Sequence, residues 1–152
     1  MSDILLRSYG VGDPPRIVKW YAKDRKGFES FMGQVVPDEL ACTMAITSLL
    51  NAVNNNVALF YMIDHGDQTI GFTGLTNITP SRDFGQPHIY IEPDSRRYSL
   101  QAAHAAENHA VQIGIKHFMI SVDYDNKRGL ALAKKLGFNE VQRKAFLKEL
   151  DV

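Results

Sequence analysis

The stretch Asp123–Val141, DYDNKRGLALAKKLGFNEV, predicts the end of a strand, a polar turn, one short helix and the start of another strand. Asp125 or Asn126 can cap the helix, because a short side-chain oxygen accepts a hydrogen bond from a free N–H of the first turn. Gly137 can adopt the left-handed conformation that ends a helix. The apolar residues of the helix share one face or lie beside it: Leu130, Leu132, Ala133 and Leu136.

The remaining elements follow from apolar periodicity and from turn residues. Strands are predicted at Ile4–Tyr9, Val57–Ile63, Thr69–Leu75, Pro87–Ile91 and Ile115–Val122, with two short ones in Phe138–Leu150 around Arg143 and Lys144. Helices are predicted from Pro15 to about Lys26, continuing through Met32, at Leu40–Val53, and from Leu100 to Ile113, while Thr76–Gln86 is a polar loop. Helices that lie between strands indicate an α/β or α+β domain with a mixed sheet.

Composition narrows the class of protein. A chain of 152 residues fits one domain spanning residues 1–152. Its 17 basic and 17 acidic residues cancel, which argues against a nucleic-acid partner bound by bulk charge. The single cysteine, Cys42, fits a reducing compartment. The chain begins without a signal-peptide shape, and no apolar run approaches the ~20 residues of a membrane helix. We therefore expect a cytoplasmic protein that uses no membrane.

The C-terminal stretch resembles a motif of a known enzyme family. Asn126, Leu130, Leu132, Lys135, Gly137 and Phe138 resemble the pattern N-x-x-A-x-x-L-Y-x-K-x-G-F of the Gcn5-related N-acetyltransferases, the GNAT family. The run TIGFTGL at Thr69–Leu75 is also similar to the family's third strand. Gly129 stands where the family has Ala, and Ala133 where it has the Tyr that protonates the departing CoA thiolate. The resemblance implies a GNAT-like mixed, mostly antiparallel central sheet flanked by helices, with acetyl-CoA as the acyl donor.

The turn after the fourth strand would then hold the cofactor diphosphate. The family turn reads roughly V-x-P-x-x-R-G-x-G-x-G/A, and this chain keeps Pro93 and Arg96 but replaces the glycines. The residues of the span are Ile91, Pro93, Arg96, Arg97, Tyr98, Ser99, Leu100 and Gln101. Backbone N–H groups at a helix N-terminus bind anions, which supports a diphosphate site. A plain helix cap by Asp94, Ser95 or Ser99 is the alternative.

Other site residues follow from the same resemblance. Ile89, Tyr90 and Ile91 are assigned to the pantetheine arm, with Asn126 meeting it from the opposite side. With Ala133 in place of Tyr, Tyr124 and Tyr98 are the substitutes for the general acid.

Strand alternation puts His88, Tyr90 and Glu92 on one face, so all three line the cleft or all point away, and Glu92 is a candidate base. The histidines are scattered, and His104 and His109 lack the i, i+4 spacing of a metal pair, so no metal is predicted.

Two functions remain open. The first is an acetyl-CoA-dependent N-acetyltransferase that acts on an amine of a small molecule or protein, with a homodimer left open. The second is a non-catalytic GNAT-fold protein that binds CoA or serves as an interaction or structural component, as in a phage-like assembly. The lost glycines and Ala133 favour the second, whereas Arg96 and Asn126 favour the first.

Overall fold

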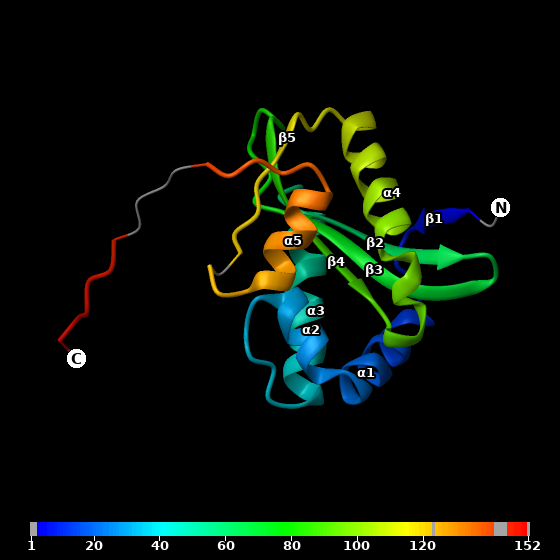
Figure 1. Ribbon diagram of the computed structural model, residues 1–152. Coiled ribbons are helices and arrows are strands. Elements are labelled where there is room, and N and C mark those ends of the chain that lie inside the picture. The colour runs from blue at the N-terminus through cyan, green and yellow to red at the C-terminus, as the bar shows by residue number, and fades with distance from the viewer. Residues whose placement is uncertain (1–2, 123, 142–145, 152) are drawn as a thin grey trace. The chain divides into compact units, whose positions relative to one another are not determined.

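The structure is a computed structural model that describes residues 3–122, 124–141 and 146–151. It comprises two compact units, Met1–Ile120 and Ser121–Val152. The first unit contains a five-stranded sheet whose spatial order follows the chain (Figure 1). Its strands are β1 (Ile4–Arg7), β2 (Leu59–His65), β3 (Gln68–Thr76), β4 (Phe84–Ile91) and β5 (His117–Phe118). All neighbours are antiparallel except β4 and β5, which are parallel, so the mixed, mostly antiparallel sheet is confirmed.

Helices flank the sheet, and polar side chains cap the starts of some of them. They are α1 (Asp13–Lys23), α2 (Arg25–Met32), α3 (Glu39–Asn54), the 3-10 helix η1 (Pro93–Tyr98) and α4 (Ser99–Gln112). Asp38 caps α3, because its carboxylate accepts from the Ala41 N–H at 2.8 Å. Gly33, with φ of 67°, supplies the left-handed residue that ends α2. No helix within the described part of the chain is long and apolar enough to cross a membrane.

Alternate side chains of the sheet go to two separate cores. On one face, Phe72 and Tyr90 stack at 5.2 Å and pack among buried residues of α1, α2 and α3, including Phe28. On the other face, Ile63 and Ile91 pack against Ala102 of α4. The sheet is thus the middle layer of the first unit, and β4 contributes to both cores.

A β-bulge in β3 adjusts this alternation. Ile63 pairs with Gly71, but Asp64 pairs with Thr69, so Ile70 is an extra residue on β3. Ile70 therefore joins Ile63 on the α4 face and is fully buried. A Cβ at Gly71 would lie 2.0 Å from the carbonyl oxygen of Tyr90, so the close approach of β3 to β4 requires glycine there.

We predict that Gly71→Ala lowers the free energy of unfolding by about 1–3 kcal/mol, because the methyl group forces β3 away from the β4 backbone. Urea denaturation followed by circular dichroism measures the loss. Gly10→Ala is the matched control, because its Cβ would meet only ordinary contacts at 3.6 Å or more. Equal stability of the two variants would contradict the close approach at Gly71.

Three sequence predictions of the first unit were wrong in their bounds. The strand expected at Ile115–Val122 is reduced to His117–Phe118. Phe84–Gln86, placed in the loop, belongs to β4. The first long helix is two helices, because Asp24 leaves the helical conformation (φ −139°, ψ 61°) and its side chain caps α2 by accepting from Gly27 N–H.

The second unit contains α5 (Lys127–Lys135), which confirms the predicted short helix. Asn126 is its cap, because its side-chain oxygen accepts from the Gly129 N–H at 2.9 Å. Gly137, with φ of 87°, has the predicted left-handed conformation. The strands expected within Phe138–Leu150 are absent from residues 138–141 and 146–150. Asp123, Arg143 and Lys144 lie outside the described residues.

Candidate active site

β4 has an edge that loses its strand partner early. Its pairing with β5 ends at Gly85↔Phe118, where the Gly85 carbonyl accepts from the Met119 N–H at 3.0 Å. The next N–H on that edge would belong to Pro87, which has none. Because alternate residues of a strand share an orientation, the backbone of Ile89 faces the same side as Gly85. Within residues 3–120, no strand pairs with Ile89 there, and we call this position the open edge of β4.

The three residues assigned to the pantetheine arm have different environments. The side chain of Ile89 is 36% exposed, whereas Tyr90 and Ile91 are buried in the two opposite cores. The Ile91 carbonyl accepts from Arg96 Nε at 3.3 Å. The open edge therefore centres on Ile89.

The turn after β4 is the 3-10 helix η1, and Glu92 holds it. The Glu92 carboxylate accepts from Asp94 N–H at 3.1 Å and from Ser95 Oγ at 2.5 Å, and the residue is only 6% exposed. Its own N–H donates to the Ile70 carbonyl at 2.8 Å. The sequence proposed Asp94, Ser95 or Ser99 as the cap, but the side chain that caps the turn is that of Glu92. Its role as a base stays a prediction.

η1 continues directly into α4, and this changes the donors available to an anion. The Ser99 N–H donates to the Arg96 carbonyl, and the Ser95 N–H donates to the Glu92 carbonyl. Ser99 is half-buried, whereas Leu100 and Gln101 are exposed. A diphosphate would meet fewer free backbone donors here than at a glycine-rich turn, so charged side chains matter more.

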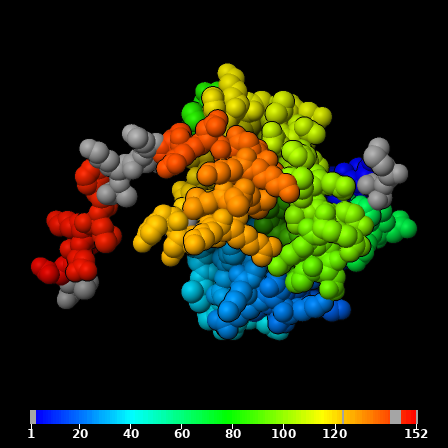
Figure 2. Space-filling view, in the orientation of Figure 1, coloured from blue at the N-terminus to red at the C-terminus, as the bar shows by residue number. Residues whose placement is uncertain are grey.

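Arg96 forms an ion pair with Asp24 within the first unit. Its Nη2 lies 2.6 Å from Asp24 Oδ2, which also accepts from the Tyr90 hydroxyl at 3.0 Å. Burial and the nearby Asp24 carboxylate raise the pKa of Tyr90. A Cβ at Gly27 would lie 2.3 Å from Asp24 Oδ2, so this glycine makes room for the pair. The group Asp24–Tyr90–Arg96 joins the α1–α2 junction to the end of β4, and Figure 2 shows η1 beside α1 at the surface.

Arg97 is more available than Arg96. It is exposed, and its guanidinium lies 4.7 Å from the centre of the Tyr98 ring, while Nη1 donates to the Asp94 carbonyl at 3.2 Å. Tyr98 in turn stacks on His65 of the β2–β3 hairpin at 4.0 Å. Arg97 and Tyr98, both assigned to the diphosphate turn, therefore form one stack with His65 at the surface of the first unit.

The remaining predicted site residues belong to the second unit. Tyr124 is 92% exposed, and Asn126 caps α5. Both are accessible from the second unit's own surface, and the capping bond uses only the Asn126 side-chain oxygen.

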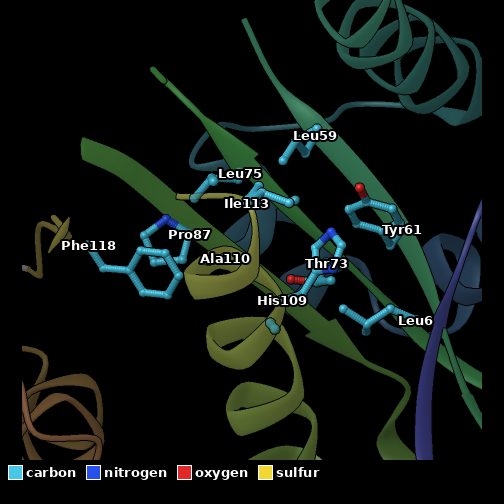
Figure 3. A pocket seen from close by; sticks show the side chains of 12 residues that line it. Leu6, Leu59, Tyr61, Thr73, Leu75, Pro87, His109, Ala110, Ile113 and Phe118 are labelled. Atoms are coloured by element: carbon cyan, nitrogen blue, oxygen red, sulfur yellow. The ribbon is translucent and has the colours of Figure 1, made fainter. Parts of the chain in front are cut away.

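A small cavity of about 30 Å³ lies between the sheet and α4 (Figure 3). His109 points toward Tyr61 there, with ring centres 4.7 Å apart, and its buried Nε2 has no hydrogen-bond partner among the described residues. A cavity of this size holds about one water molecule. It is therefore too small for an acyl donor or an acceptor, and the candidate site is the open edge with η1.

Sequence reasoning missed two side chains of this region. Asp24 carried a signal, because a carboxylate three residues before Gly27 is a capping spacing. Glu92 was noticed as a base but not as a cap. Cys42, by contrast, is fully buried, and burial raises the pKa of its thiol to about 11. Among the residues that the structure describes, no group of three or more His, Cys, Asp or Glu side chains could hold a metal ion.

Comparison with known proteins places the chain in a family. A family model described as an acetyltransferase (GNAT) domain matches residues 3–139. The chain therefore belongs to the GNAT acetyltransferase family. No curated protein matches it significantly.

Solved structures share the fold at low identity. An acetyltransferase from Salmonella typhimurium, which modifies the N-terminal serine of 50S ribosomal subunit protein L7/L12, aligns with a TM-score of 0.77 at 16% identity over 91% of this chain and 81% of its own. The ribosomal L7/L12 α-N-protein acetyltransferase in complex with coenzyme A gives 0.73, with the same identity and coverage. The microcin C7 self-immunity acetyltransferase MccE in complex with acetyl-CoA and AMP gives 0.70 at 16% identity over 90% of this chain and 78% of its own.

Because Arg96 is ion-paired with Asp24 and Arg97 has no such carboxylate partner among the described residues, we predict different effects of replacing them. Arg96→Ala leaves the Asp24 carboxylate, which is only 18% exposed, without its cation and should lower the free energy of unfolding by about 1–3 kcal/mol. Arg97→Ala, in the exposed neighbour, should change it by less than about 0.5 kcal/mol.

Urea denaturation compares the two variants, and a double-mutant cycle of Arg96→Ala with Asp24→Asn isolates the pair. A coupling energy near zero would show that the 2.6 Å contact contributes no stability.

Proposed function

We propose that this protein transfers the acetyl group of acetyl-CoA to an amine of a small molecule or protein. The observation that carries the proposal is the open edge of β4, because an unpaired strand backbone can hydrogen-bond an extended chain that bears amides. The pantetheine arm of acetyl-CoA is such a chain. Membership in the GNAT family and the CoA and acetyl-CoA complexes of two structural relatives support it.

For the pantetheine arm we propose Ile89, Tyr90 and Ile91 of β4. Asn126 is proposed for the same arm on the ground of the family resemblance alone. The diphosphate is held by the η1–α4 turn, and Arg97 supplies the most available charge. The turn residues proposed for this contact are Arg96, Arg97, Tyr98, Ser99, Leu100 and Gln101.

Proton transfers require further groups. Tyr124 or Tyr98 donates a proton to the CoA thiolate in place of the Tyr that Ala133 replaces. Glu92 is the base that the sequence suggests, and to reach an amine it would have to leave its bonds to Asp94 and Ser95. We also propose a cytoplasmic location, on the evidence of the single cysteine.

The second candidate function is a non-catalytic GNAT-fold protein, which binds CoA or acts as an interaction or structural component. The specific observation in its favour is η1, whose internal hydrogen bonds occupy part of the backbone donors at the α4 N-terminus. Fold does not separate the two candidates, so binding and turnover must be measured separately.

Acetyl-CoA binding is the first prediction of the proposal. At about a hundredfold excess over its dissociation constant, the cofactor should raise the free energy of unfolding by about 2.7 kcal/mol. A thermal-shift titration measures this, and Arg97→Glu should weaken binding without changing the melting temperature of the free protein. No shift up to millimolar acetyl-CoA would refute the cofactor assignment.

Turnover is the second prediction, measured as thiol release with a panel of alkylamines, polyamines, amino acids and peptides. If Tyr124 is the general acid, Tyr124→Phe should lower the rate by ~100- to 10,000-fold and leave acetyl-CoA affinity nearly unchanged. Tyr98→Phe is the parallel test. Full activity of both variants would remove tyrosine as the proton donor, and no release with any acceptor would favour the non-catalytic function.

A further inference from the structure

The imidazole of His88 lies where three segments of the first unit meet. β4 places it on the sheet face that α2 covers, where its ring contacts the Phe31 ring edge-on at 5.7 Å. Its Nε2 lies 2.8 Å from Thr76 Oγ1, at the last residue of β3. His88 and Thr76 are both only partly buried. The next residue along β4 is Ile89, on which the open edge is centred.

Burial favours the neutral form of this ring. Burial lowers the pKa of His88, the Phe31 backbone raises it by a smaller amount, and the net effect is a pKa below the usual 6.5. None of the ionisable groups on the elements packed against it contributes to the shift: Arg25, Lys26 and Glu29 of α2, Glu39 and Cys42 of α3, and Tyr90 of β4. The ring is therefore neutral at pH 7, and its Nε2 can accept a hydrogen bond from the Thr76 hydroxyl.

The other ionisable groups near the end of β4 are already engaged. Tyr90 donates to Asp24, and Glu92 accepts from Asp94 and Ser95. His88 Nε2 lies beside the Thr76 hydroxyl, and a hydroxyl can both donate and accept a proton in such a pair. His88 is the group on this face of β4 that can take up a proton without breaking a capping bond.

Resting on the proposed function, we propose that His88 and Thr76 together accept the proton of the incoming amine. The N–H bond of the substrate ammonium breaks as its proton passes to Thr76 Oγ1, and the Thr76 hydroxyl proton passes to His88 Nε2. The neutral amine then forms a C–N bond with the thioester carbon and the C–S bond breaks. The second amine proton goes to the thiolate, and His88 returns its proton to water. The products are the acetylated amine and CoA with a free thiol.

A kinetic experiment tests the pair. His88→Gln keeps a polar side chain but cannot take up a proton, so kcat/KM for a primary alkylamine should fall by ~100- to 10,000-fold. Wild-type activity should drop as pH falls through the lowered pKa of His88, and this acidic limb should be absent in the variant. An aromatic amine, which is already neutral at pH 7, should lose much less. Equal losses for the two kinds of amine, or no loss for either, would overturn the proposal.

Two further measurements keep the test independent of folding and of acceptor choice. Thr76→Val retains the imidazole and should show the same selective loss, whereas His104→Gln on the exposed side of α4 should leave kinetics unchanged. NMR of the histidine rings should show the His88 signals shifting when acetyl-CoA saturates the protein. If calorimetry detects acetyl-CoA binding and the His88 signals do not move, the inference fails while the proposed function stands. If acetyl-CoA does not bind, both fail.

Discussion

Pro87 is the constraint on which the candidate site depends. A strand in the middle of a sheet normally forms backbone hydrogen bonds to a neighbour on each side. Pro87 has no N–H to donate on the β5 side. β4 therefore keeps its full antiparallel pairing with β3 and pairs with β5 over two residues only. The sheet is stable because both cores still close on β4, with Tyr90 on one face and Ile91 on the other. The unpaired backbone at Ile89 is thus held in place by packing on both sides.

The turn after β4 is held by side chains where the family uses glycines. Glu92 fixes the start of η1, and Arg96 attaches it to Asp24 at the α1–α2 junction. Such bonds order the turn before any ligand arrives, which lowers the entropy lost on binding. The same bonds engage backbone N–H groups of the turn and the guanidinium of Arg96, which a diphosphate could otherwise bind. A site built this way depends on the exposed charge of Arg97 and on the β4 edge more than on backbone cradling.

The sheet and α5 could be predicted from the sequence because their signals are local. A strongly apolar run marked β2, the run TIGFTGL marked β3, and Asn126 with Gly137 marked the two ends of α5. The length of β5 could not be predicted, since the apolar run extends to Val122 and the pairing depends on the neighbouring strand, where Pro87 offers no N–H. The Asp24–Arg96 contact joins residues 72 positions apart, and nothing near either residue indicates the other. Contacts between residues of elements far apart in the chain could therefore not be predicted from the sequence.

The sequence indicated Glu92 as the general base, whereas the structure favours His88 for this role. Alternation placed both on one face with Tyr90, and a carboxylate is the more familiar base. What alternation could not show is that Glu92, directly after the last residue of β4, turns its carboxylate back and caps the next turn. His88 remains inside the strand, where α2 and the end of β3 hold it half-buried with its Nε2 beside the Thr76 hydroxyl. A base must be both accessible and deprotonated, and for histidine desolvation favours the deprotonated, neutral form but reduces access. At the border between a buried face and an open edge, the two conditions can be met together.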